Sequence, residues 1–467
     1  MKKLLLTTTV LVTAFCMQAA IAENRAFPTK KIDNAPAKDV SSYGAPSLGF
    51  SGVFDQQMGF RLQDNKYIKK ADIGTPFTVR KIGVSKFNPN MGFDTRAALN
   101  VTAKGKTSSG LNYGANIGIY NLIGFPKDNK AALKSKNFLY MDDDNMGRLE
   151  IGGKEGASET MLSTAENVAA ATGGVAGSWY KYVNLNTYNP TATATVTAFR
   201  TQAVNSADFY MGTGSLLDNG TAESSAVQKA RKLTYYTPKI KDTGIQFGIS
   251  YIPDSKNYPS IVTGEFAGYP NTSTIDPAKD KGFKDGFMAG LTWENKLDKD
   301  NTIKMDLVGE HGSLPKDLKT VYYKVQTVGG SLSHTWKDLS GVISYNYFGK
   351  SGLVKTGSAA PATAPKIKKD NYIATLGFGY NIDSKTRVSL TGLMSEKWKN
   401  KFRNISLGMD YKLAPGLIPY AEVSCFEMKQ KFKDTSVANV AGNARQASAN
   451  VYKNKGTSFI LGTKVKF

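Results

Sequence analysis

The feature of this chain that most restricts its fold is an alternation of apolar and polar side chains with a period of two, repeated in segments of about ten residues. In the first segment Phe54, Met58 and Phe60 share one parity, and Asp55 and Gln57 share the other. Successive side chains of a β-strand point to opposite faces, so each segment predicts a strand with one apolar and one polar face. A tilted strand of about ten residues is long enough to cross a bilayer.

The segments recur often enough to predict about 16 strands, an even number of the kind that bacterial barrels use. Their approximate starts are residues 48, 92, 108, 135, 146, 229, 243, 284, 301, 326, 339, 370, 384, 402, 416 and 456. The composition also favours strands and turns, with 45 glycines, 23 tyrosines and 23 phenylalanines. We therefore expect an all-β protein, a transmembrane antiparallel up-and-down β-barrel.

The connections between the segments alternate strictly between short and long. The short ones fit tight turns and span residues 104–108, 142–145, 241–244, 296–301, 337–340, 381–385 and 414–416. The long ones fit loops on the opposite side and include residues 63–91, 154–228, 253–284, 350–369 and 429–455. A soluble β-sandwich has no reason for this asymmetry, whereas an up-and-down barrel with both termini on one side of a membrane requires it.

The first 22 residues have the three parts of a secretory signal peptide. Lys2 and Lys3 form a basic head, residues 4–15 are an apolar run, and Ala20 and Ala22 belong to a small-residue cleavage motif. The apolar run is shorter than the roughly 20 residues that a membrane-spanning helix needs. We expect cleavage after Ala22 and export of the mature chain.

Behind the signal peptide, the polar residues 23–46 predict a short extension without fixed structure, and the barrel then takes residues 47–467. Of the two cysteines, Cys16 lies in the expected signal peptide, so only Cys425 remains and no internal disulfide can form. A mean hydropathy of −0.32 and the lack of a long apolar stretch after the signal argue against a protein of membrane-spanning helices.

The charge balance is strongly basic. The formal net charge is +22, and the loss of Lys2 and Lys3 with the signal leaves +20. Such an excess suits nucleic acid, an anionic lipid surface or a pore that favours anions. We expect no nucleic-acid partner, because the chain is exported and its lysines are dispersed through loops rather than gathered in a basic arm.

The chain ends on an alternating segment with an aromatic last residue. The apolar parity of this segment holds Phe459, Leu461, Val465 and Phe467. The ending resembles the C-terminal signal of outer-membrane barrels that the barrel-assembly machinery recognises, and the strand number resembles that of the Gram-negative general porins. The resemblance covers nearly all of the mature chain by its rhythm. It implies a homotrimer in the cell outer membrane, exported through the periplasm and in contact with membrane lipid and lipopolysaccharide.

The longest connection, residues 154–228, follows Gly147–Gly153, which resembles the porin strand that leads into a constriction loop. The resemblance implies that this third loop folds into the lumen. Within it, Ser163 and Glu166 have the spacing of a helix capping box. We expect a short helix there that continues through residues 169–171 and ends at residues 173–174, where two glycines follow. The loop is long for this family, so residues 191–197 are candidates to lie outside the lumen.

Strand parity and the family resemblance together predict which charged residues form the constriction. Four arginines have inward parity, namely Arg61, Arg96, Arg148 and Arg387. Porins commonly place a basic wall opposite acids on the third loop, so we expect these arginines to face Glu155, Glu159 and Glu166. Arg96 is the strongest single candidate.

The resulting hypothesis is a pore for passive diffusion of small hydrophilic solutes and ions, with a mild preference for anions. We expect no enzyme, because the only two histidines, His311 and His334, have no catalytic motif around them. For the same reason we expect no metal ion and no cofactor. A substrate-specific channel and a surface adhesin built on the same barrel remain alternatives.

Overall fold

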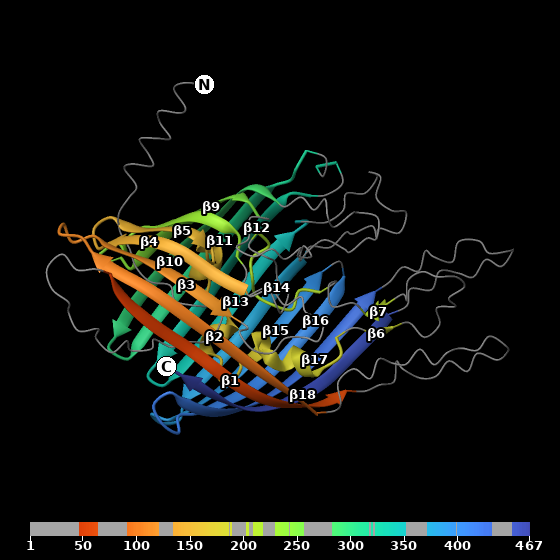
Figure 1. The fold of residues 1–467 in the computed structure, drawn as a ribbon. Coiled ribbons are helices and arrows are strands. Elements are labelled where there is room, and N and C mark those ends of the chain that lie inside the picture. The colour runs from red at the N-terminus through yellow and green to blue at the C-terminus, as the bar shows by residue number, and fades with distance from the viewer. Residues whose placement is uncertain are drawn as a thin grey trace, which may run out of the picture.

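In the computed structural model of the chain, sixteen antiparallel strands close into one barrel (Figure 1). The barrel strands are β1 (Ser47–Gln63), β2 (Met91–Lys106), β3 (Asn112–Tyr120), β4 (Lys134–Asp143), β5 (Gly147–Gly153), β8 (Arg231–Tyr236), β9 (Ile245–Asp254), β10 (Lys284–Asp298), β11 (Asn301–Ser313), β12 (Val325–Trp336), β13 (Leu339–Gly349), β14 (Asn371–Asn381), β15 (Thr386–Lys397), β16 (Asn400–Tyr411), β17 (Leu417–Lys431) and β18 (Val451–Lys466). Each strand pairs with the next along the chain, which confirms the predicted fold class.

The structure describes most of the barrel and part of the longest connection. The described residues are 46–63, 91–120, 134–185, 187–188, 202–204, 209–217, 229–241, 243–255, 283–316, 319–320, 323–351, 371–397, 399–431 and 451–467. The expected signal peptide, its cleavage site at Ala20 and Ala22, nearly all of the extension and residues 191–197 lie outside this description. These expectations stay predictions.

The first and last strands close the barrel, with β1 and β18 side by side in Figure 1. Their pairing runs from Val53 opposite Lys466 to Gln63 opposite Gly456. The C-terminal residue continues the pairing, since the backbone N–H of Gly52 donates to the carbonyl of Phe467 at 2.8 Å. A Cβ atom on Gly52 would lie 2.6 Å from the Phe467 ring, so glycine leaves room for the terminal aromatic side chain.

The two faces of the strands divide as the alternation predicts. Large apolar side chains of the outward face are exposed, as expected of a surface that meets lipid. Examples are Phe50, Leu62, Phe93, Leu139, Leu307, Ile343, Ile405 and Leu407. The inward face carries mainly polar residues such as Asp55, Gln57, Thr375 and Ser406.

The predicted alternation of connections is wrong at one place. The link between β15 and β16 belongs to the end of the barrel where the long loops lie, yet it holds only residues 398–399. The pairing continues through Lys397 opposite Asn400, and Lys399 takes a left-handed φ of 71°. A two-residue hairpin of this kind closes the ladder without a loop. The first turn also comes later than predicted, because Lys104 and Lys106 still pair with β3.

Smaller elements lie in the long connection between β5 and β8. They are the helix α2 (Ala157–Met161), the 3₁₀ helices η2 (Ala165–Val168), η3 (Gly174–Ala176) and η4 (Ser178–Tyr182), and the two-stranded sheet β6 (Thr187–Tyr188) and β7 (Gln202–Val204). No helix in the described part of the chain is long and apolar enough to cross a membrane.

Candidate functional site: the lumen and its inner loop

Two described parts of the connection between β5 and β8 lie inside the barrel, and we call residues 154–185 the belt and residues 209–217 the return segment. The belt follows the inner wall for most of its circumference. Helix α2 contacts β8 to β11, η2 contacts β13 to β15, η3 contacts β15 to β17, and η4 contacts β18 and β1. The yellow elements inside the barrel in Figure 1 show this course. For residues 154–185 and 209–217, the prediction that the third loop folds into the lumen is confirmed.

The wall holds the belt by accepting hydrogen bonds from its backbone. The belt lacks long regular structure, so its N–H groups need partners outside the belt. Inward hydroxyl and carboxylate groups supply them. The pairs are Ala157 N with Ser250 Oγ (2.8 Å), Ser163 N with Asp306 Oδ2 (2.9 Å), Ala165 N with Thr375 Oγ1 (3.1 Å), Ala170 N with Ser389 Oγ (2.7 Å), Ala171 N with Asp410 Oδ1 (3.0 Å) and Thr172 N with Glu422 Oε2 (2.9 Å).

These bonds explain why the predicted helix is shorter than expected. Ala170 and Ala171 donate to the wall instead of to a preceding turn, and Ala171 has a left-handed φ of 52°. The chain turns at Gly173 and Gly174, whose φ values are 120° and 64°. A Cβ atom on Gly174 would come within 2.3 Å of Thr391 Oγ1, so glycine permits the close approach to β15.

The capping box also differs from the predicted one. At the start of η2, Asn167 Oδ1 accepts a hydrogen bond from the Thr164 backbone N–H at 2.6 Å. The predicted partner Glu166 instead accepts a hydrogen bond from the Thr213 hydroxyl. This contact joins the belt to the return segment. The backbone N–H of Ser163, which the predicted capping box would pair with Glu166, donates to Asp306 on the wall instead.

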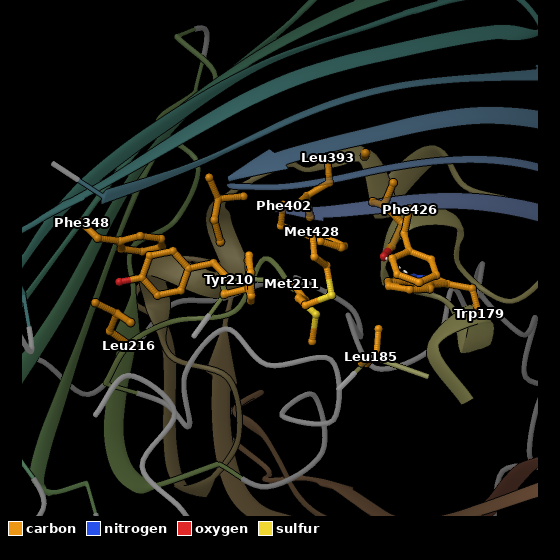
Figure 2. Packing of buried hydrophobic residues seen from close by; sticks show 14 of the residues in the cluster. Trp179, Leu185, Tyr210, Met211, Leu216, Phe348, Leu393, Phe402, Phe426 and Met428 are labelled. Atoms are coloured by element: carbon orange, nitrogen blue, oxygen red, sulfur yellow. Dashed lines mark hydrogen bonds between the residues drawn. The ribbon is translucent and has the colours of Figure 1, made fainter. Parts of the chain in front are cut away.

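An apolar cluster fills part of the lumen between the barrel wall and the belt with its return segment, which together we call the inner loop (Figure 2). Trp179 is 1% exposed, and its ring centroid lies 5.9 Å from that of Phe402 and 5.4 Å from that of Phe426. Tyr210 of the return segment lies 4.8 Å from the Phe348 ring. Other inward residues of the cluster are Ile252, Met288, Ile373, Leu393, Met428 and Ile460.

Two buried ion pairs anchor the start of the belt. Lys136 of β4 pairs with Glu155, and both side chains are nearly inaccessible. Lys229, before β8, places its Nζ 2.6 and 2.7 Å from the two carboxylate oxygens of Glu159. Burial by itself would raise the pKa of Glu155, but the positive charges of Lys136 and Lys229 outweigh it and lower that pKa to about 2.

Exposure of the inward side chains differs between two parts of the wall. On β14 to β17, Thr375, Thr391 and Ser406 are 3%, 1% and 1% exposed beneath the inner loop. On β2 to β5, inward residues such as Asn116, Tyr140 and Arg148 remain partly exposed, and we call this the less covered wall. The described part of the loop therefore covers one wall more closely than the other.

Comparison with known proteins identifies this architecture. The sequence profile of the Gram-negative porins matches residues 7–430. The chain belongs to the Gram-negative porin family. Its family and its barrel make it an outer-membrane porin, a channel protein.

Relatives of this porin occur in Rickettsia. An uncharacterized protein of Rickettsia felis is 28% identical over 496 residues and covers 100% of both chains. An uncharacterized protein of Rickettsia typhi is 27% identical over 437 residues, which cover 88% of this chain and 92% of that protein. Among solved structures, an anion-selective porin from Comamonas acidovorans has 13% identity and a TM-score of 0.49, and a mutant of the Rh. blastica porin has 12% and 0.43. Both alignments cover 90% of this chain and 100% of the other.

The four nominated arginines of the porin all lie on the inward face but at different heights. Arg61 is close to the loop end of β1, whereas Arg148 and Arg387 are each the second residue of a strand that starts at the turn end. Arg96 on β2 lies opposite Asp55 of β1. Asp55 is six residues before Arg61 on β1, so Arg96 and Arg61 differ in height by about 20 Å at the usual rise of a strand. They do not form one cluster.

The arginines also have partners other than the predicted acids of the loop. Arg96 donates to the Ser178 hydroxyl of the belt and lies 3.7 Å from Asp55. Arg387 donates to the carbonyl oxygen of Val168 at 3.0 Å. Two nominated arginines thus fasten the belt to the wall.

Arg148 instead joins a charged group on the less covered wall. Its Nε lies 2.6 Å from Glu150, its Nη1 lies 3.6 Å from Asp142, and its guanidinium carbon lies 4.3 Å from the centre of the Tyr140 ring. Lys154 also binds Glu150 at 2.7 Å. Glu155 and Glu159 pair with the lysines Lys136 and Lys229, and the expected pairing of the loop acids with the arginines stays a prediction.

Sequence reasoning missed the apolar part of the lumen. Phe402, Leu393 and Phe426 occupy inward parity, near the loop end of strands whose outward parity is already apolar. A run with apolar residues on both parities is the signal that could have found them. The burial of these three side chains shows that part of the inner wall is covered by protein rather than by water.

Proposed function

We propose that this porin forms a water-filled channel for passive diffusion of small hydrophilic solutes and ions, and that the aqueous path follows the inward face of β2 to β5. The observation that carries the proposal is the contrast in exposure between the two walls. Inward residues of β14 to β17 are buried under the inner loop, whereas Asn116, Tyr140 and Arg148 keep contact with solvent. A barrel of 16 strands leaves a channel that side chains of the wall alone do not fill.

The many bonds between belt and wall support a fixed constriction. The belt's backbone bonds to six inward side chains of β9, β11, β14, β15, β16 and β17, and the apolar cluster adds burial. Such a lining narrows the channel permanently and selects by cross-section. The ion pairs in the lumen reduce the field across it, so we propose only a mild preference for anions, in the direction of the net positive charge.

Paired cysteine variants test the path. In a background with Cys425→Ala, Asn116→Cys places a thiol on the less covered wall and Ser406→Cys places one beneath the belt. A charged methanethiosulfonate reagent added during planar-bilayer recording should reduce the current of the Asn116→Cys channel and leave the Ser406→Cys channel unchanged. Block of the Ser406→Cys channel alone would place the path on the opposite wall.

Liposome swelling separates a general channel from a substrate-specific one. For general diffusion, rates for neutral sugars and amino acids should fall smoothly with size and show no saturation. A solute that permeates much faster than others of its size would contradict the general reading and support the substrate-specific alternative.

We also propose that the mature chain starts after Ala22, passes through the periplasm and assembles as a homotrimer. The C-terminal strand with Phe459, Leu461, Val465 and Phe467 is proposed as the segment that the barrel-assembly machinery recognises. Deletion of Phe467 should lower the amount of folded barrel in outer membranes, and removal of the exposed Leu48 side chain by substitution with Ala serves as a matched control. Equal amounts of folded barrel in all three proteins would refute the role of Phe467.

A further inference from the structure

A basic hollow lies at the loop end of β11, β12 and β13. Its volume is about 740 Å³, which is within the usual range of ligand pockets. Three lysines, a histidine and two tyrosines contribute to its lining, namely Lys319, Lys324, Lys350, His311, Tyr323 and Tyr347. Among the described residues that line it, none is an aspartate or a glutamate.

Strand register places three residues of its lining, His311, Gln326 and Tyr347, on the outer face of the barrel. His311 lies opposite the exposed Phe287 on β10 and opposite Gln326 on β12. Tyr347 lies opposite Val328, which is 50% exposed on the outward face. The residues that point into the lumen from these strands, Glu310 and Phe348, belong to the other parity. A solute on the pore path would not meet this site.

An apolar surface continues directly from the hollow along the same outward face. Leu307, Val328 and Tyr345 are 57%, 50% and 49% exposed there. Tyr345 stacks on Tyr372 with the ring centres 5.6 Å apart, and aromatic side chains of this kind gather at the level of lipid headgroups. The lysines therefore lie where the apolar band ends, at the level at which the headgroup of a membrane lipid meets the barrel.

The chemistry of the lining fits a phosphate group. Lysine ammonium groups bind phosphate as point charges, and tyrosine hydroxyls can donate hydrogen bonds to its oxygens. The Nζ of Lys350 lies 5.5 Å from the centre of the Tyr323 ring, which holds one ammonium group at the hollow. We propose that this hollow binds the phosphate headgroup of a lipid with a net negative charge, whose acyl chains lie along β11 to β13.

Native mass spectrometry of the full barrel, released from a zwitterionic detergent, tests the proposal with phosphatidic acid as the probe. The test variant is Lys324→Gln with Lys350→Gln. The control is Lys241→Gln with Lys299→Gln, which removes two exposed lysines from turns at the other end. We expect the test variant to lose affinity for phosphatidic acid by at least about tenfold, since each lysine contributes to attraction of an anionic lipid. The control should bind as the unchanged protein does.

Further arms identify the source of the phosphate and separate this site from the pore. Phosphatidylcholine should bind equally to both variants, and inorganic phosphate at the same concentration should not displace phosphatidic acid. Equal loss of affinity in test and control variants, or displacement by equimolar inorganic phosphate, would overturn the proposal. The channel conductance of the test variant should match that of the control, because the hollow lies outside the lumen. A conductance change confined to the test variant would place the lysines on the solute path and would equally overturn it.

Discussion

Glu155 of the belt and Lys136 of β4 form an ion pair in which both side chains are almost inaccessible to water. Removal of one partner from such a pair leaves the other charge buried, and this costs far more than loss of an exposed pair. The sequence could not reveal the pair, because residues 136 and 155 meet only once the belt has entered the barrel. Parity did place Arg61, Arg96 and Arg148 on the inward face, but it carries no information on height or partner.

The first prediction concerns this pair. Glu155→Gln should lower the free energy of unfolding by about 3–5 kcal/mol, because the buried charge of Lys136 would lose the carboxylate that faces it. Denaturant unfolding of the barrel in detergent measures it. Glu294→Gln is the matched control, since its partner Lys239 is 50% exposed and exposed pairs contribute about 0–1 kcal/mol. A similar small loss in both variants would refute a buried anchor.

The second prediction gives the pH dependence of the same carboxylate. The pKa of Glu155 lies at about 2 in the folded barrel, below its ordinary value of 4.5. Its contribution to stability is therefore complete above about pH 4.5 and is lost as the pH falls through 2. The stability difference between the unchanged protein and Glu155→Gln should stay constant from pH 8 to pH 5 and shrink below that. A difference that already vanishes at pH 6 would contradict the lowered pKa.

At the scale of elements, the barrel wall determines the conformation of the belt. Local sequence predicts a helix through residues 169–171, but Ser389 and Asp410 bind the N–H groups that the helix would use. The strands themselves follow from the alternation of the sequence because the lipid-facing and lumen-facing sides are each set by local residues. The pattern of long and short links did not predict the short connection at residues 398–399. Its length is set by the pairing of Lys397 with Asn400, which the pattern does not contain.

The third prediction tests the attachment of the belt. Trp179→Ala removes a buried ring that packs on Phe402 and Phe426, a change that typically costs about 3–5 kcal/mol. A loosened belt should give noisier single-channel currents and faster cleavage of the inner loop by a protease added to the reconstituted barrel. Phe378→Ala on the outward face is the control and should change neither. Unchanged noise and cleavage in Trp179→Ala would show that the cluster does not hold the belt.

At the scale of the whole molecule, several charged side chains in the lumen are paired with an opposite charge, so the formal net charge of +22 does not by itself set the field there. The field that a passing ion meets therefore depends on a few groups, of which Arg148 lies on the less covered wall. Sequence rhythm was enough for the barrel and for the position of the third loop. It could not divide the lumen into a covered and an open part, because that division depends on contacts between residues far apart in the chain.

The fourth prediction concerns ion selectivity. The reversal potential across a bilayer under a salt gradient should show a mild preference for anions, and Arg148→Gln should shift it toward cations. Arg403→Gln makes the same charge change on the outward face and should leave it unchanged. Strong cation preference of the unchanged protein would refute the charge assignment, and equal shifts in both variants would refute the role of Arg148.

The central claim is that water and ions pass through this barrel beside a fixed inner loop. Single-channel recording of the purified protein in a planar bilayer tests it most directly. We predict stepwise increases of conductance as barrels insert, with open channels at low voltage and without any added ligand. Folded, inserted barrels that give no conductance steps would show that the inner loop closes the lumen, and would contradict the claim.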